Sequence, residues 1–264
     1  MNDYLKSNMI PANPVKMMLN IGALLDIPTG TFIKGANGEQ ILLGGLGYLT
    51  GFTGRGNMFK STIVHYMMLS AANRICSTVN TSMGTYDTEI NIHESRLLAL
   101  TRRHNNFKDK DIIEEGIWNI TDRTIYQGNE WFEKLKEYLN HKKDLGAKIE
   151  YETPFLSRDG RTKMKMMAPT FGEVDSFSSF QTADVAKIQE ENEIGDSGGN
   201  TIHMRQGLAK LRFMMEVPTL AASSNHFFLL TAHLGQETAI AAGPYAVPPP
   251  KKLQHMKQGE KIKG

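Results

Sequence analysis

The sequence has little that would direct the chain out of a reducing cell interior. It contains one cysteine, Cys76, among 264 residues, which excludes an internal disulfide framework and favours a reducing compartment. No apolar run approaches the length needed to cross a bilayer, and the N-terminus lacks the charged-then-apolar pattern of a signal peptide. We therefore expect a cytoplasmic protein, in its own cell or in that of an infected host, with no membrane partner.

A strong net charge is also absent. Thirty Lys and Arg residues oppose 28 Asp and Glu residues, which gives a formal charge of +2 at pH 7 with His neutral. That charge is too small to indicate an anionic partner for the whole chain, so any nucleic-acid surface must be a local concentration of basic residues. With 40% hydrophobic and 22% charged residues, the chain is long enough for one globular domain with a large core and excursions from it.

A candidate phosphate-binding loop is the main chemical signal that is present. Gly54, Lys60 and Ser61 fit the pattern Gly, four residues, Gly, Lys, Ser or Thr, but Phe59 stands where the second glycine belongs. Backbone N–H groups in such a loop form a nest for phosphate oxygens, and the start of the next helix adds partial positive charge. Lys60 would then reach the outer phosphates of ATP and Ser61 would hold Mg²⁺. The candidate nucleotide-binding residues are Gly54, Arg55, Gly56, Asn57, Met58, Phe59, Lys60, Ser61 and Thr62.

The segments on either side of the loop favour this interpretation. Residues 48–52 are predicted to form a short buried strand, and residues 61–72 a mostly apolar helix. Phe59 argues against it, because glycine before the lysine usually allows close approach of loop and helix, and a benzyl group there needs room on the protein side. The alternative is a glycine-rich turn that merely starts a helix.

The rest of the chain predicts an α/β fold in which helices cover a mostly parallel sheet. An entry arm is expected at residues 1–20. Residues 148–167 predict a β-hairpin inserted at the edge of the core, with an Asp-Gly turn at Asp159 and Gly160. The methionine pairs of the chain are expected to pack in its core. Further strands are predicted at 77–86, up to Asp175 and at 225–232, helices at 94–103, 130–139 and 203–216, and a loop at 189–201.

Three polar residues follow predicted strands, namely Glu89, Asp175 and His233. Residues beyond the carboxyl ends of parallel strands converge on one crevice, so these side chains are expected to face the phosphate loop. Asp175 would support Mg²⁺ through water, Glu89 would polarise the attacking water and His233 would sense the γ-phosphate, because phosphoryl transfer depends on positioning and charge neutralisation. Singly, each has a plainer explanation: a helix cap for Asp175, a solvated loop acid for Glu89 and a hydrogen-bonded polar residue for His233.

With these motifs in place, the sequence resembles the RecA-like strand-exchange ATPases, particularly the phage UvsX-type branch. The matching features are the acid in Asp87-Thr88-Glu89, the pair Asp175-Ser176 after an apolar strand, His233 at the end of a later strand, and Phe59 before the loop lysine, which the phage branch tolerates. Residues 195–211 are similar to the family's first DNA-binding loop and the helix after it. The resemblance covers about residues 21–245.

The resemblance implies a RecA-like P-loop core and a filament-forming, DNA-dependent ATPase of recombination or repair. Such a protein uses ATP and Mg²⁺, binds single-stranded DNA and pairs it with homologous duplex DNA. It also implies that Lys60 and Ser61 bind phosphate and Mg²⁺, that Glu89 activates water, that Asp175 supports the metal and that His233 couples the nucleotide to a DNA loop. Two alternatives are a ring-forming DNA helicase with the same fold and a nucleotide-dependent structural or regulatory module with little turnover.

Two features near the C-terminal end of the sequence bear on this resemblance. Family cores continue into further strands, whereas this sequence ends at Gly264, so either it is a fragment or the missing strands come from the N-terminal arm or a neighbouring subunit. Residues 246–264 are predicted to form a basic, proline-containing tail or DNA-binding loop, in which spaced lysines can neutralise DNA phosphates. For the lysines of the tail, the alternative is a solvated tail that does not contact DNA. For Arg205, in the predicted helix 203–216, the alternative is a contact between subunits. The candidate DNA-binding residues are Arg205, Tyr245, Lys251, Lys252 and Lys257.

Overall fold

The computed structural model describes residues 28–34, 40–44, 47–76, 80–156, 161–191, 199–236 and 260–262. The predicted entry arm at 1–20 and the turn at Asp159 and Gly160 lie outside these residues. So do Tyr245, Lys251, Lys252 and Lys257, whose assignment to DNA binding therefore stays a prediction.

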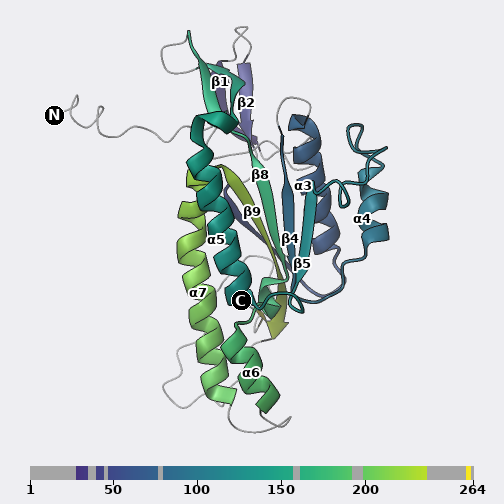
Figure 1. Cartoon of the computed structure of the whole chain (residues 1–264), viewed down its shortest axis with the longest axis vertical. Coiled ribbons are helices and arrows are strands. Elements are labelled where there is room, and N and C mark those ends of the chain that lie inside the picture. The colour runs from purple at the N-terminus through teal and green to yellow at the C-terminus, as the bar shows by residue number, and fades with distance from the viewer. Residues whose placement is uncertain are drawn as a thin grey trace, which may run out of the picture.

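A mostly parallel sheet forms the centre of the described chain (Figure 1). Its parallel strands lie side by side in the order β3 (Leu49–Gly54), β9 (His226–Gln236), β8 (Thr170–Asp175), β4 (Met83–Asp87) and β5 (Trp118–Asp122). The short strand β10 (Glu260–Ile262) pairs antiparallel with the end of β9. The predicted α/β fold is confirmed at this level.

Helices cover both faces of this sheet. Figure 1 shows α3 (Lys60–Ile75) and α4 (Glu94–Thr101) on one side, and α5 (Gly128–Leu145) and α7 (Gly199–Ser224) on the other, with α6 (Ala183–Glu191) near one end of α7. Side chains alternate along the strands, so Phe171 packs toward α3 whereas Val174 packs toward α5 and α7. Among the described residues, no helix is long and apolar enough to cross a membrane.

Two antiparallel pairs of strands lie apart from the main sheet. One pair consists of β1 (Pro28–Lys34) and β2 (Gln40–Gly44). The other consists of β6 (Glu150–Leu156) and β7 (Lys163–Met167), and the short 3-10 helix η1 (Gly146–Ile149) comes directly before β6. The second pair lies in the region 148–167. That this region is an insertion into a RecA-like core stays a prediction.

Several predicted boundaries differ from the observed ones. Helix α7 begins at Gly199, inside the predicted loop 189–201, and continues past Glu216 through Pro218 to Ser224. Helix α5 begins before Glu130, because Gln127 and Glu130 form a capping box. Strand β5 has no counterpart in the prediction, since its five residues are too few to establish an alternating pattern.

Candidate nucleotide site

The loop from Gly54 to Lys60 connects the end of β3 to the start of α3. Asn57 and Phe59 have left-handed backbone conformations, with φ angles of 58° and 56°. A left-handed conformation is the one that glycine adopts without steric cost, which explains why glycine suits the position before the lysine. The Phe59 side chain is 72% exposed, so it points away from the protein. The expectation that its ring needs room on the protein side was therefore wrong.

The first turn of α3 is open to an anion. Helix α3 has neither a side-chain cap nor an acidic residue in its first turn. The backbone N–H groups of a first turn have no partner within the helix, and they carry the positive end of the helix dipole. The Thr62 hydroxyl is engaged by Arg96 of α4, which donates a hydrogen bond to it. Ser61, which the sequence predicts to hold Mg²⁺, is the other hydroxyl of this turn.

Lys60 lies across the loop and reaches the end of a neighbouring strand. Its Nζ donates a 2.9 Å hydrogen bond to the Arg55 carbonyl oxygen and lies 3.4 Å from Nδ1 of His233. His233 is paired in register with Gly54, where the loop begins. A charged lysine can only donate, so the His233 tautomer that suits this contact accepts at Nδ1 and carries its hydrogen on Nε2.

Glu89 completes a chain of polar contacts that starts at Lys60. Its Oε1 lies 2.8 Å from Nε2 of His233 and accepts hydrogen bonds from the hydroxyls of Ser176 at 2.6 Å and Ser179 at 3.4 Å. Burial by itself would raise the pKa of Glu89, but the hydrogen bonds from Ser176 and His233 lower it below its ordinary value. Glu89 is therefore an ionised carboxylate at neutral pH.

The loop that carries Glu89 is fixed by two residues that the sequence reasoning did not assign to the site. The carboxylate of Asp87 accepts four backbone N–H groups, those of residues 89 to 92, at 2.8 to 3.0 Å. Thr88 bonds to the end of β8: its hydroxyl donates to the Ser176 carbonyl, and its N–H donates to the Asp175 carbonyl, both at 2.7 Å. The signal that would have identified this role is an Asp at the end of a strand, followed by loop residues whose N–H groups need partners.

Asp175 lies at the end of β8 and is buried. Its Oδ1 accepts a hydrogen bond from the Thr231 hydroxyl, and the short 3-10 helix η2 (Phe177–Ser179) that follows has no side-chain cap. The helix-cap explanation is thus not what the structure shows for Asp175. Its other oxygen, Oδ2, is buried and has no hydrogen-bond partner among the residues that the structure describes.

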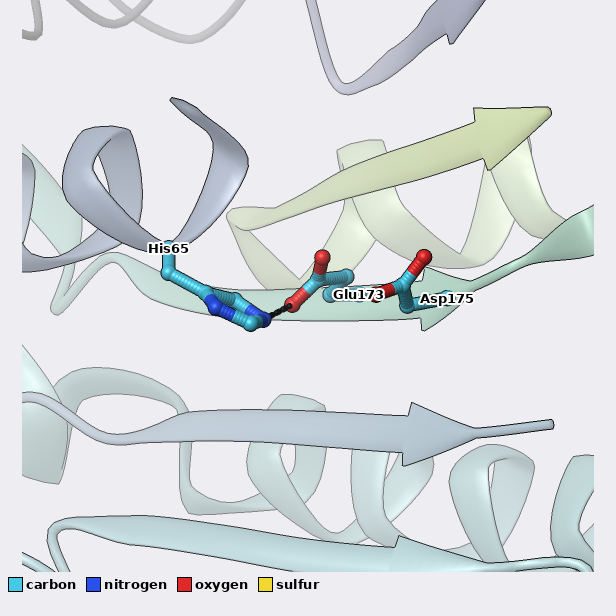
Figure 2. Close-up of side chains that lie close together, drawn as sticks. All are labelled: His65, Glu173 and Asp175. Carbon is cyan, nitrogen blue, oxygen red and sulfur yellow. Dashed lines mark ion pairs between the residues drawn. The ribbon is translucent and has the colours of Figure 1, made fainter. Parts of the chain in front are cut away.

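Asp175 has two buried neighbours that were not predicted, His65 of α3 and Glu173 of β8 (Figure 2). His65 Nε2 and Glu173 Oε2 lie 3.0 Å apart, and Thr85 donates a 3.1 Å hydrogen bond to the same carboxylate. Burial raises the pKa of Glu173. Burial alone would lower the pKa of His65, but the adjacent carboxylates of Glu173 and Asp175 raise it above its ordinary value.

The structure thus brings together Lys60, His233 and Glu89, and it places Asp175 in a separate buried group with His65. Ser61 lies one helical turn before His65, so both residues are on the same face of α3. Ser61 and the unpartnered Oδ2 of Asp175 offer oxygen atoms of the kind that Mg²⁺ prefers, and the residues present therefore fit this ion.

The DNA-binding candidate within the described part of the chain is Arg205, which is exposed on α7. The neighbouring cation Lys210 is buried and donates a 2.9 Å hydrogen bond to the Ser178 carbonyl, and burial lowers its pKa to about 8. Arg212 pairs with Glu216 on the same helix. Lys210 therefore holds α7 against η2, the helix next to the Glu89 site.

A scan against models of known protein families gives no match, and a search of curated proteins gives none either.

Proposed function

We propose that this chain is a DNA-dependent ATPase of recombination or repair, which binds single-stranded DNA as an oligomer and pairs it with a homologous duplex. The observation that carries the ATPase part is the chain of contacts from Lys60 through His233 to Glu89 beside the open first turn of α3. This chain of contacts connects the Lys60 ammonium group, which can bind phosphate, to the Glu89 carboxylate, which can bind water. Lys60 begins the helix that follows β3, Glu89 lies in the loop after β4, and His233 lies on β9 where its parallel pairing with β3 ends. Ligands of open α/β sheets bind at this end of the strands.

Phosphate oxygens would lie at the N-terminus of α3, where free N–H groups and the helix dipole attract them. Lys60 would exchange the Arg55 carbonyl for the outer phosphates, which replaces a hydrogen bond to a neutral oxygen by a stronger one to an anionic oxygen. Ser61 and Asp175 would hold Mg²⁺, with Asp175 acting through water. When bound, Mg²⁺ neutralises charge that develops on the phosphate oxygens.

Glu89 would orient the attacking water and accept its proton. Its hydrogen bonds to Ser176 and His233 all reach Oε1. One oxygen of the carboxylate is therefore held by the protein, and Oε2, which accepts from the Asn91 side chain at 3.2 Å, lies toward the exposed side of the loop. A carboxylate fixed at one oxygen has a defined direction, and positioning of this kind is the main source of rate in phosphoryl transfer.

His233 would report the state of the nucleotide to α7. The backbone N–H of His233 donates to the Ser178 hydroxyl at 2.8 Å, and the Ser178 carbonyl accepts the hydrogen bond from Lys210 of α7. Withdrawal of Lys60 toward phosphate removes one of the two contacts of the His233 ring. Helix α7 carries Arg205, so this path supports coupling between nucleotide and DNA.

The DNA part of the proposal depends on the resemblance to strand-exchange ATPases and on the lysines of the tail, Lys251, Lys252 and Lys257. Spaced lysines contact DNA phosphates with little sequence preference, so single strands should bind without a defined sequence and more weakly as salt rises.

The test is equilibrium binding of Mg²⁺-ATP to the full chain, by calorimetry, in the presence and absence of single-stranded DNA. We expect Lys60→Ala to weaken ATP binding at least tenfold, because a charge-assisted hydrogen bond contributes about 1.5 kcal/mol or more. Lys108→Ala is the matched control, since Lys108 is an exposed lysine whose ion-pair partner is the exposed Asp109. Equal affinity of both variants and the original chain for ATP would remove the loop from nucleotide binding.

A further inference from the structure

Unsatisfied buried polar atoms gather at one place in the described chain. Seven buried side-chain nitrogen or oxygen atoms among the described residues lack a hydrogen-bond partner, and four of them belong to His65, Glu173 and Asp175. One of these four, His65 Nε2, still has an ion-pair contact with Glu173 at 3.0 Å. One ligand atom from each residue can be chosen so that all three lie within 4.8 Å of one another. Figure 2 shows the imidazole of α3 directed at the two carboxylates of β8.

Such a cluster is costly unless something else lies within it. All three side chains are at least 97% buried, as their exposed fractions are 2%, 0% and 3%. A buried polar atom normally has a partner, and a buried carboxylate without compensation carries a large desolvation cost. Two carboxylates beside one imidazole leave negative charge in the core. A divalent cation would neutralise that charge, and the unpartnered carboxylate oxygens could bind to it.

We propose that His65, Glu173 and Asp175 bind one divalent transition-metal ion, Zn²⁺ or Mn²⁺, inside the protein. The imidazole nitrogen favours these ions over Mg²⁺ and Ca²⁺, which prefer oxygen ligands alone. Metal bonds to imidazole nitrogen or carboxylate oxygen are about 2.0 to 2.2 Å long, so two ligand atoms at a tetrahedral angle on one ion lie about 3.4 Å apart. The three ligand atoms lie within 4.8 Å of one another, so the widest pair would have to close by up to about 1.4 Å.

The residues around the cluster suit a metal centre. Thr85 donates a hydrogen bond to Glu173, and Thr231 donates one to Asp175. These hydrogen bonds fix the orientation of both carboxylates. Thr85 is in turn fixed by Trp118, whose Nε1–H donates to its hydroxyl at 2.9 Å. Partners of this kind orient ligands and tune their affinity for metals. The ion would fasten α3, whose N-terminus ends the phosphate loop, to strand β8.

This ion would share Asp175 with the proposed nucleotide site, where Asp175 would act on Mg²⁺ only through water, but its other two ligands are the buried His65 and Glu173. The inference does not depend on the proposed function, since it requires neither ATP nor DNA. It is therefore tested on the nucleotide-free chain.

The experiment measures metal content by elemental mass spectrometry on the full chain purified without chelator, then thermal unfolding after chelation and after adding Zn²⁺ or Mn²⁺ alone. We expect about one ion per chain and a midpoint about 5 to 10 °C higher with a 100-fold excess of the ion over its dissociation constant. In the Co²⁺-loaded chain we also expect visible d–d absorption that depends on His65.

Three variants make the result specific. His65→Gln should lose the ion, the shift and the Co²⁺ absorption, whereas His104→Gln, a matched change at another buried histidine with an unpartnered Nε2, should keep all three. Lys60→Ala should also keep them, because it changes only the nucleotide site. The inference is overturned if the original chain carries no transition metal and neither ion shifts its unfolding, or if His65→Gln retains the ion.

Discussion

The buried lysine Lys142 makes protein stability depend on pH in a direction that few lysines produce. It lies on α5 and is only 4% exposed, and its Nζ donates to the Thr170 hydroxyl at 2.8 Å and the Asn225 carbonyl at 3.1 Å. The Thr170 hydroxyl also lies 2.8 Å from Nδ1 of His226. These partners are neutral, so they do not offset the loss of hydration of an ammonium group. Burial lowers the pKa of Lys142 to about 7 from the ordinary 10.5.

The sign follows from proton binding. Between about pH 7 and pH 10.5 the unfolded chain holds a proton on Lys142 that the folded chain has released, so the free energy of unfolding rises with pH across this window. The destabilisation by Lys142 is fully present below pH 7 and disappears above pH 10.5. For one group with these two pKa values, we expect a gain of about 2 kcal/mol from pH 7 to pH 9.

Urea unfolding of the original chain and of Lys142→Met at pH 7 and pH 9 measures this gain. Lys142→Met keeps most of the side-chain volume and removes the titration, so its free energy of unfolding should rise by about 2 kcal/mol less over the same interval. Lys210, whose pKa burial lowers to about 8, adds a slope of the same sign to both proteins and cancels in the comparison. Burial keeps the pKa of His226 well below its ordinary value, so it stays neutral throughout. Identical pH dependence of the two proteins would refute the reasoning.

Two other predictions concern the site and the strands behind it. His233→Ala should bind Mg²⁺-ATP with equal or higher affinity in calorimetry, because Lys60 loses a competing contact. Its rate of ATP hydrolysis, measured by phosphate release, should fall about 100-fold or more because Glu89 loses its 2.8 Å partner. Weaker ATP binding with unchanged turnover would contradict this role. Gly172→Ala should lower the free energy of unfolding in urea by at least about 1 to 3 kcal/mol, because its Cβ would lie 2.4 Å from Nε2 of His226. Gly84→Ala is the control, because Gly84 is paired in register with Gly172 and a Cβ at Gly84 would lie 4.0 Å from its nearest neighbour, the Asn119 carbonyl oxygen. Equal losses of unfolding free energy in the two variants would show that this steric explanation is wrong.

The sequence predicted that Lys60, Glu89 and His233 would lie together, as they do, but it also placed Asp175 with them, whereas Asp175 lies in a separate buried group. Lys60, Glu89 and His233 each follow a predicted strand, and the convergence of parallel strand ends on one crevice is a general rule. The buried pair of His65 and Glu173 could not be predicted in this way. These residues are 108 positions apart in the printed sequence, and their contact depends on how α3 lies over β8, which strand patterns do not specify.

Conformation and exposure also lay beyond the sequence patterns. Phe59 argues against the phosphate loop only if its side chain points inward, but the left-handed backbone turns it toward solvent. Met67 and Met68 are core residues as predicted, whereas Met214 and Met215 are exposed at 43% and 71%. Composition does not distinguish these pairs, because the outcome depends on which face of each helix contacts the sheet.

The rate of phosphate release from ATP, with and without single-stranded DNA, tests the central claim most directly. We expect single-stranded DNA to stimulate hydrolysis by the original chain, and we expect Glu89→Gln to bind Mg²⁺-ATP normally while hydrolysing it about 100-fold or more slowly, because an amide keeps the shape of the side chain but cannot accept the proton. A folded chain that binds ATP and shows no stimulation by single-stranded DNA, or a Glu89→Gln variant with unchanged turnover, would contradict the account.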